Sequence, residues 1–234
     1  MKLTVINCQG RYPSAGHGCN SYLISHGGAN IALDMGSGAV MNFLRHTEYE
    51  KLSAVVLTHL HYDHIADIFS LFYISSYRKR TRKLKVFLPR TPNKIAERIA
   101  ECQDFDIVYI DEGMKTDIGG IRMEFYSMTH PVETYGVKLY TDKVLSYTSD
   151  TTYNENLVRL IDGADTVLGD CCILEKDWTD KSPHISVAHL AMLAAGKRLL
   201  LGHLPENGRE GILSEAMRYN AKSVLLYDGM VVKI

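Results

Sequence analysis

The chain carries, directly after the apolar segment 54–57, the sequence Thr58-His59-Leu60-His61-Tyr62-Asp63-His64. The apolar segment predicts a short buried strand, and residues i and i+2 of an extended segment project to the same side. We therefore expect His59, His61 and Asp63 to face one cavity, with His64 turning in from the start of the next helix. Four ligand-type side chains within six residues predict a metal site. Imidazole and carboxylate ligands suit zinc, with manganese or iron as alternatives.

Short strands and helices alternate on both sides of this segment. Runs rich in β-forming residues predict strands at 2–7, 21–25, 31–34, 54–58, 85–88, 121–128, 135–140, 144–147, 166–168, 198–201 and 223–227. Apolar residues at helical spacing predict helices at 37–46, 65–77, 92–102, 154–161, 186–195 and 208–219, the third beginning with Pro92 in its first turn. This order implies two sheets with helices outside. Because no repeat or linker interrupts it, we expect a single domain over residues 1–234.

The motif His-x-His-x-Asp-His resembles that of the metallo-beta-lactamase superfamily, whose other landmarks follow in order over essentially the whole chain. They are Asp34 in Leu33-Asp34-Met35-Gly36-Ser37-Gly38, His130 after a strand, Asp150 at the end of Ser146-Tyr147-Thr148-Ser149-Asp150, and His203 after Leu199-Leu200-Leu201-Gly202. The resemblance implies an α+β fold in four layers (αββα), in which helices flank two mixed β-sheets.

The resemblance also implies two divalent metal ions. By position, His59, His61 and His130 would hold one ion, Asp63, His64 and His203 the other, and Asp150 would bridge them. Asp34 would accept hydrogen bonds and so orient the metal-binding loop. Clustered carboxylates also fit such ions on physical grounds, since buried acids without compensating cations take up protons instead of staying charged.

Several branches of the superfamily differ from this chain. Dinuclear lactamases have cysteine at the position of Asp150 and no histidine at that of His64, and flavodiiron proteins usually have glutamate at that of His61 and add a flavin domain. Glyoxalase II-like thioesterases continue into a C-terminal helical domain, whereas only some thirty residues follow His203 here. Lactonases have similar ligands and remain open as an alternative.

The segment Pro183-His184-Ile185-Ser186 is similar to a histidine-containing motif of the ribonuclease Z and phosphodiesterase branch. There the histidine reaches the phosphate and stabilises charge or protonates the leaving oxygen. The bacterial enzymes insert a long transfer-RNA-binding arm between the positions of His130 and Asp150, where this chain has only a pair of strands. It therefore looks like the small ribonuclease Z-like proteins that lack the arm, for which transfer-RNA processing does not follow.

We therefore expect a dinuclear, zinc-dependent hydrolase, specifically a phosphodiesterase acting on a small phosphodiester, a cyclic nucleotide or a short RNA end. A hydroxide shared by the two metals would attack phosphorus. Asp63 would orient it or accept its proton, and His184 would donate to the developing anion or leaving group. One alternative is a carboxylic or thiol ester hydrolase, with His184 merely preceding a helix capped by Ser186. Another is a non-enzymatic protein that binds metal or a nucleotide.

Composition sets the remaining expectations. The net charge of −1 gives no overall attraction to nucleic acid, so we expect no stable nucleic-acid complex. The cationic run Arg78-Lys79-Arg80-Thr81-Arg82-Lys83-Leu84-Lys85 is open to two interpretations, phosphate contact or a helix end favoured by cations. Five cysteines, including the adjacent Cys171 and Cys172, suit packing in a reducing compartment. Short apolar stretches and the lack of an apolar leader predict a cytoplasmic protein without membrane contact. The expected substrate is a small molecule or short nucleotide, and dimers, common among the proteins it resembles, make a homodimer an expected assembly.

Overall fold

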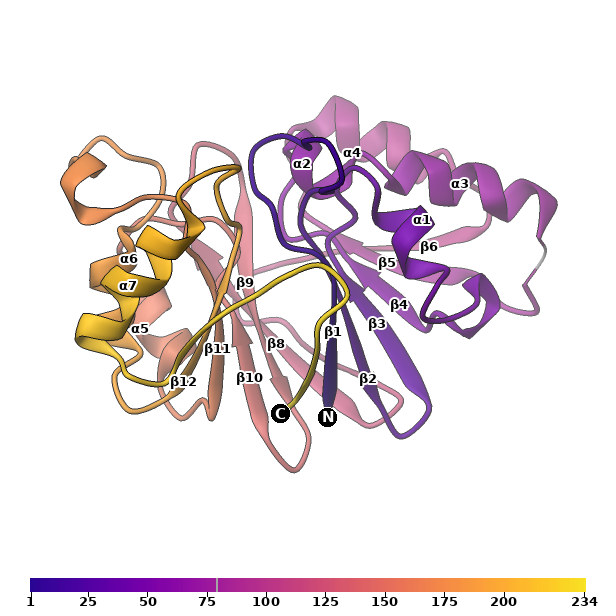
Figure 1. Ribbon diagram of the computed structural model, residues 1–234. Helices are drawn as coiled ribbons and strands as arrows, with labels where there is room; N and C mark the ends of the chain where they lie inside the picture. The colour runs from indigo at the N-terminus through magenta and orange to yellow at the C-terminus, as the bar shows by residue number, and fades with distance from the viewer. Residues whose placement is uncertain (79) are drawn as a thin grey trace.

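Two mixed β-sheets pack face to face in the computed structural model, which describes residues 1–78 and 80–234 (Figure 1). Among the described residues the first sheet has the order β14 (Val231–Lys233), β1 (Lys2–Asn7), β2 (Ser21–His26), β3 (Ala29–Leu33), β4 (Ala54–Val56), β5 (Leu84–Leu88), β6 (Phe105–Tyr109). The second sheet has the order β13 (Ser223–Leu225), β12 (Arg198–Gly202), β11 (Thr166–Asp170), β10 (Val144–Tyr147), β9 (Thr134–Tyr140), β8 (Ile121–Met128), β7 (Lys115–Ile118).

Helices cover the outer face of each sheet (Figure 1). The first sheet is covered by α1 (Ala39–Phe43), α2 (Tyr62–Ile65), α3 (Ile68–Tyr77) and α4 (Asn93–Ala100), and the second by α5 (Glu155–Ile161), α6 (Val187–Leu193) and α7 (Arg209–Tyr219). Short 3₁₀ turns lie at Tyr49–Lys51 and Glu175–Asp177. The predicted four-layer α+β architecture is thus confirmed.

Each sheet is part antiparallel and part parallel. In the first, β14, β1, β2 and β3 pair antiparallel, and β3 to β6 run parallel. In the second, β7 to β10 pair antiparallel, and β10 to β13 run parallel. The parallel strands of a sheet end at one common edge, where loops can bring polar side chains together. β1 pairs with β14, so the two chain ends lie side by side (Figure 1).

The core between the sheets is apolar and tightly filled. Phe87 on β5 and Phe125 on β8, at most 1% exposed, place their ring centroids 6.0 Å apart and so join the two sheets. A second apolar cluster lies between the first sheet and its helices. Strands β9 and β10 with their short turn fill the interval in which the long arm was predicted to be missing.

Several predicted boundaries were wrong. The helix predicted at 65–77 is interrupted, because Asp67 uses its backbone N–H for Met35 O (2.9 Å) and its carboxylate for Val40 N (2.8 Å). Pro92 precedes α4 in an extended conformation instead of lying in its first turn. Strands β6, β7 and β14 were not predicted, because they lie at sheet edges and mix polar with apolar residues and so lack a continuous apolar run.

Part of the cationic run is used in local pairing. Arg78 pairs with Glu50 (Nη2 to Oε2 2.6 Å), and Lys85 pairs with Asp106 (Nζ to Oδ2 2.7 Å). Lys79 lies outside the described residues. Within the described part of the chain, every helix is too short or too polar to cross a bilayer.

Candidate metal centre

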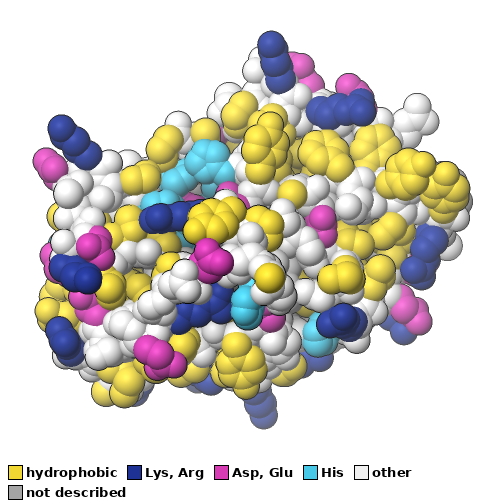
Figure 2. Space-filling view, turned by 45° about the horizontal axis from the view of Figure 1, so that its top comes forward, with side chains coloured by type: hydrophobic (Ala, Val, Ile, Leu, Met, Phe, Trp, Pro, Cys, Tyr) yellow, Lys and Arg dark blue, Asp and Glu magenta, His cyan; other side chains and the backbone are white. Residues whose placement is uncertain are grey.

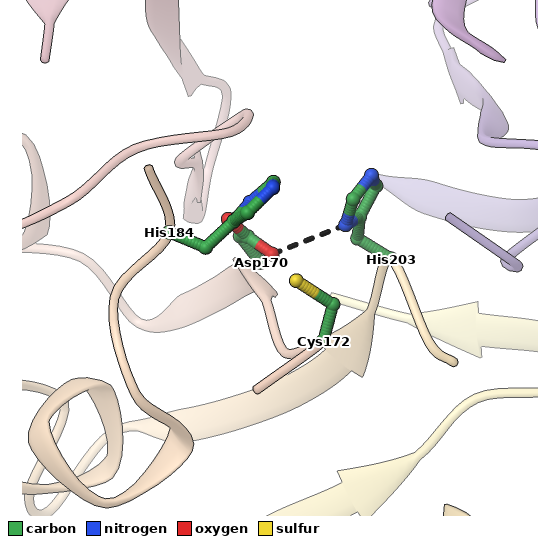
Figure 3. Close-up of side chains that lie close together, drawn as sticks. All are labelled: Asp170, Cys172, His184 and His203. Carbon is green, nitrogen blue, oxygen red and sulfur yellow. Dashed lines mark hydrogen bonds and ion pairs between the residues drawn. The ribbon is translucent and has the colours of Figure 1, made fainter. Parts of the chain in front are cut away.

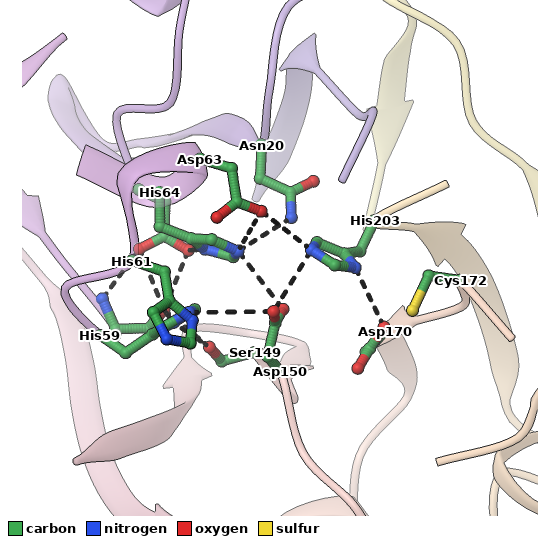
Figure 4. A network of polar contacts seen from close by, with 12 residues as sticks. Asn20, His59, His61, Asp63, His64, Ser149, Asp150, Asp170, Cys172 and His203 are labelled. Atoms are coloured by element: carbon green, nitrogen blue, oxygen red, sulfur yellow. Dashed lines mark hydrogen bonds and ion pairs between the residues drawn. The ribbon is translucent and has the colours of Figure 1, made fainter. Parts of the chain in front are cut away.

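The seven predicted metal ligands come together at one edge of the two sheets. All of them except His130 are labelled in Figure 4. Each follows the end of a strand, either β4, β8, β10 or β12. They are His59, His61, Asp63, His64, His130, Asp150 and His203. On the surface, histidine side chains gather in a hollow bordered by hydrophobic ones (Figure 2).

Three histidines form the first group of this centre. His61 Nδ1 lies 3.1 Å from His59 Nε2 and 3.1 Å from His130 Nε2. A tetrahedral zinc ion with Zn–N bonds of 2.0–2.1 Å holds its nitrogen atoms about 3.3 Å apart, so this spacing fits one ion. Burial lowers the pKa of all three histidines. The neutral imidazole that results is the form that binds a metal.

The second group combines carboxylates with histidines. His203 Nε2 lies 3.3 Å from Asp63 Oδ2 and 3.3 Å from Asp150 Oδ2, and His64 Nε2 lies 3.3 Å from Asp150 Oδ1. Asp150 also reaches toward the first group, with Oδ2 3.8 Å from His59 Nε2. Its carboxylate therefore lies between the two groups, as a bridging ligand would.

The chemistry of these residues fits two divalent cations. Asp63 and Asp150 bring negative charge into a largely buried site, and Asp150 Oδ1 has no aligned hydrogen-bond partner among the described residues. Burial acts to lower the pKa of His64 and His203, yet the neighbouring carboxylates raise it well above the ordinary value. The site thus calls for positive charge, which bound cations would supply in place of protons.

Hydrogen bonds orient the ligands from behind. Asp34, fully buried, accepts from His64 Nδ1 (2.8 Å), from the Tyr147 hydroxyl (2.7 Å) and from Thr58 N (2.8 Å). His130 Nδ1 faces the carbonyl oxygen of Pro183 at 3.0 Å. A ring nitrogen that donates behind the ligand leaves the other nitrogen free for the metal.

Asp170 is a site residue that the sequence analysis missed. Its Oδ2 lies 2.6 Å from His184 Nδ1, and its Oδ1 lies 3.1 Å from His203 Nδ1 (Figure 3). Asp170 ends the buried strand β11, as Asp150 follows β10 and Asp34 follows β3. An acidic residue at the end of a buried apolar strand was the available signal.

His184, the predicted catalytic histidine, lies beside the ligands and not among the loop residues facing solvent. Its ring stacks on that of His203, with centroids 5.3 Å apart, and it is 7% exposed. Burial alone would lower its pKa, but the Asp170 carboxylate raises it to about 10. Trp178 Nε1 donates to the His184 carbonyl oxygen at 3.0 Å, which fixes the segment. The Asp170 carboxylate thus favours the protonated form of His184.

Two further residues lie close to the centre, Cys172, for which packing was expected, and Gly10, for which the sequence suggested no role. Cys172 Sγ lies within 4.8 Å of ligand-type atoms of Asp170, His184 and His203 (Figure 3), whereas Cys171 is buried in the core. In the loop after β1, Gly10 approaches so closely that a Cβ there would lie 2.6 Å from ring atoms of His203.

Comparison with known proteins identifies the family. The model of a beta-lactamase superfamily domain matches residues 30–203. The chain belongs to this superfamily. The probable metallo-hydrolase YhfI of Bacillus subtilis is 30% identical over 245 residues, covering 96% of this chain and 93% of that protein. Ribonuclease Z of Archaeoglobus fulgidus is 24% identical over 143 residues, covering 58% of this chain and 46% of that protein.

Solved structures share the fold of this superfamily member. The crystal structure of the metallo-beta-lactamase fold protein YhfI from Bacillus subtilis superposes with a TM-score of 0.93 at 24% identity, covering 99% of this chain and 98% of that one. The short form of human tRNase Z superposes with a TM-score of 0.79 at 18% identity, covering 100% and 99%. These structures show the shared fold, and the domain match together with the similarity to the probable metallo-hydrolase YhfI makes the chain a hydrolase of the metallo-beta-lactamase superfamily.

Proposed function

We propose that the protein is a dinuclear metal-dependent phosphodiesterase acting on a small phosphodiester, such as a cyclic nucleotide or a short RNA end. The observation that carries the proposal is the position of His184, whose ring stacks on that of the proposed ligand His203 and whose protonated form is favoured by Asp170. A phosphoryl group in transfer carries negative charge on several oxygens, so it gains from a cationic donor beside the metals. In ester hydrolysis at a carbonyl the charge develops mainly on one oxygen, which a metal ion can stabilise.

The two groups of ligands would hold the ions of this reaction. His59, His61 and His130 would bind one ion, Asp63, His64 and His203 the other, and Asp150 both. Divalent ions at such a centre supply Lewis acidity and make a water nucleophilic near neutral pH. Zinc suits the nitrogen-rich first group, and manganese or iron remain compatible with the donor set.

Asp63 would orient the attacking water. Burial acts to raise the pKa of Asp63, but His64 and His203 hold it well below its ordinary value, so the side chain stays ionised. Its Oδ2 accepts a hydrogen bond from the backbone N–H of Arg11 at 2.7 Å. An ionised and fixed carboxylate can accept a hydrogen bond from water and aim its lone pair at phosphorus.

His184 would complete the reaction on the leaving-group side. Its Nδ1 is held by Asp170 at 2.6 Å, which leaves Nε2 to point away from that carboxylate. A proton on Nε2 can be given to the departing alkoxide, while Asp170 stabilises the ring charge until then. Proton donation of this kind contributes about 10²–10⁴-fold to a rate.

The proposal is tested by metal analysis together with hydrolysis of bis(p-nitrophenyl) phosphate. We expect about two metal ions per wild-type chain. Asp150→Ala and His61→Ala should lose metal and activity together. His184→Ala should keep its metal but lower kcat by about 10²–10⁴-fold. His46→Ala, a histidine exposed outside the centre, is the matched control and should behave as wild type.

Three other results would contradict parts of the proposed function. Two metals with efficient hydrolysis of lactones or thioesters, but not of phosphodiesters, would replace the proposal by an ester hydrolase. Full phosphodiesterase activity in His184→Ala would remove His184 from the mechanism. Fewer than two bound ions would contradict the dinuclear centre itself.

A further inference from the structure

Arg11 places a guanidinium group at the edge of the metal centre. Its Nη2 lies 3.6 Å from Cys172 Sγ. That sulfur atom in turn lies within 4.8 Å of nitrogen atoms of His184 and His203. The guanidinium is therefore close to the place where a reacting phosphate would lie against His184.

The backbone of Arg11 is fixed against the same centre. Arg11 has a φ of 67°, a left-handed conformation that is uncommon for residues other than glycine. In this conformation its N–H donates to Asp63 Oδ2 at 2.7 Å, while the preceding Gly10 packs on the His203 ring and donates to Leu204 O at 2.9 Å. Backbone strain of this kind tends to occur at functional sites, where surrounding contacts hold it in place.

Among residues 1–78 and 80–234, the Arg11 guanidinium forms no ion pair, since no carboxylate oxygen lies within 4.0 Å of it. Its hydrogen bond goes to a thiol sulfur, a weak acceptor. By contrast, Arg78 and Arg90 on the surface each pair with a carboxylate, Glu50 and Asp111. Burial acts to lower the pKa of Arg11, and the Asp170 and Asp150 carboxylates act to raise it without forming an ion pair with it, so its N–H donors stay available to an anion.

A cavity of about 320 Å³ begins at Arg11 and Cys172. Leu174 and Ile212 give it apolar walls, and Asn207 adds a polar group. A substrate whose phosphate lies at the metal centre could place one of its ester groups there. With the ester group in the cavity, the Arg11 guanidinium at the cavity's start would lie next to the phosphate.

We propose that the Arg11 guanidinium binds a non-bridging oxygen of the substrate phosphate and makes the centre select anionic phosphodiesters over neutral esters. The inference rests on the proposed phosphodiesterase function. Arginine suits the task because its planar fork of N–H donors matches phosphate oxygens. A neutral triester, which lacks the anionic oxygen, would gain nothing from it.

The test compares an anionic phosphodiester with its methyl ester, which has the same two nitrophenyl groups but no negative charge. Arg11→Gln should raise KM for bis(p-nitrophenyl) phosphate about 10- to 100-fold, as expected for loss of a charged hydrogen bond. It should leave kcat/KM for the neutral methyl bis(p-nitrophenyl) phosphate unchanged. Arg11→Lys, which keeps the charge but not the fork, should fall between. Arg45→Gln removes the same charge from an exposed arginine elsewhere and should match the wild type.

A second readout does not depend on turnover. Binding of inorganic phosphate to the zinc-loaded protein, measured by calorimetry, should weaken about tenfold or more in Arg11→Gln. Metal content should not change, because the backbone N–H that holds Asp63 remains. Equal loss of activity toward both substrates, or loss of metal, would make Arg11 a structural residue and overturn the inference.

The two proposals can fail separately. If the wild type hydrolyses no phosphodiester, the proposed function fails, and the phosphate titration still decides the role of Arg11. Equal phosphate affinity in the wild type and Arg11→Gln would then reject it. Weaker binding in Arg11→Gln alone would uphold Arg11 as an anion-binding residue of this centre.

Discussion

Asp170 shows how one buried residue can govern two others. Its two carboxylate oxygens face His184 and His203, and the residue is 1% exposed. Burial acts to raise the pKa of Asp170, but these two histidines hold it well below the ordinary value. Asp170 therefore stays ionised and fixes the ring orientation of a proposed donor and of a proposed ligand together.

The titration of His184 tests this arrangement. In chelator-treated protein, its pKa should be about 10, as set by Asp170 against the effect of burial. In Asp170→Asn, the pKa should fall, because burial is then opposed only by the more distant Asp150 carboxylate (Oδ2 3.9 Å from Nδ1) and by Cys172. Nuclear magnetic resonance of the ring protons against pH measures both values. An unchanged pKa would show that Asp170 does not control the charge of His184.

The raised pKa of His184 also makes the free energy of unfolding depend on pH. The pKa of His184 is higher in the folded state than in the unfolded state. The pairing of His184 with Asp170 therefore stabilises the fold fully below the unfolded pKa of about 6.5, and this contribution is lost as pH rises through about 10. The difference in free energy of unfolding between wild type and Asp170→Asn should therefore shrink over that interval. Chemical unfolding of chelator-treated protein at several pH values measures it, and a difference that grows with pH would contradict the pairing.

At the scale of elements, helix α6 holds the segment that carries His184. Its N-cap is Ser186, fully buried, whose hydroxyl accepts from His189 N at 3.3 Å. Ile185 N donates to Thr151 O at 2.6 Å, which ties the same segment to the residue after Asp150. The start of one helix thus sets the position of the proposed donor relative to a proposed bridging ligand.

Removing the cap of α6 should affect stability and turnover but not the metal. Ser186→Ala should lower the free energy of unfolding by about 1 kcal/mol, because one N–H of the first turn loses its acceptor. We also expect kcat to fall while metal content stays as in the wild type. Urea unfolding, metal analysis and phosphodiester assays measure these quantities. Ser76→Ala, an exposed serine on α3, is the control and should change stability by less than about 0.5 kcal/mol. Loss of metal in Ser186→Ala would contradict the prediction that the cap positions His184 without affecting metal binding.

At the scale of the whole molecule, the metal centre depends on how the two sheets pack. His59 and His61 follow β4 of the first sheet, whereas His130 follows β8 of the second. The three nitrogen atoms of the first group can therefore meet only if the sheets keep their relative position. The contact between Phe87 and Phe125 is part of the packing that holds it.

Phe125→Ala should therefore weaken both the fold and the metal site. Loss of this fully buried ring removes packing between the sheets and should cost about 3–5 kcal/mol in free energy of unfolding. Zinc affinity should fall as well, because the two halves of the first group lose their fixed spacing. Tyr77→Ala removes a ring that is 75% exposed and should alter stability by less than about 0.5 kcal/mol. A stable Phe125→Ala with wild-type zinc affinity would show that the sheets do not depend on this contact.

Much of this organisation was predictable from local sequence patterns. Apolar runs predicted the central strands. The segment from His59 to His64 indicated a metal site because it has four ligand-type side chains within six residues. The resemblance to a known family then supplied the order of Asp34, His130, Asp150 and His203. Edge strands such as β7 were not predicted, because they are half-exposed and their mixed polar and apolar residues show no clear periodicity.

The sequence by itself determined the chemical types at the centre, the order in which they follow buried strands, and the family to which the chain belongs. Only the tertiary structure decided which of these residues touch. Asp170 contacts His203, and Arg11 contacts Asp63, across 33 and 52 positions of sequence. Such contacts depend on the pairing of β11 with β12 and on the path of the loop after β1, and the free energy that selects these arrangements comes from burying the core as a whole. These long-range contacts therefore cannot be predicted from local sequence composition.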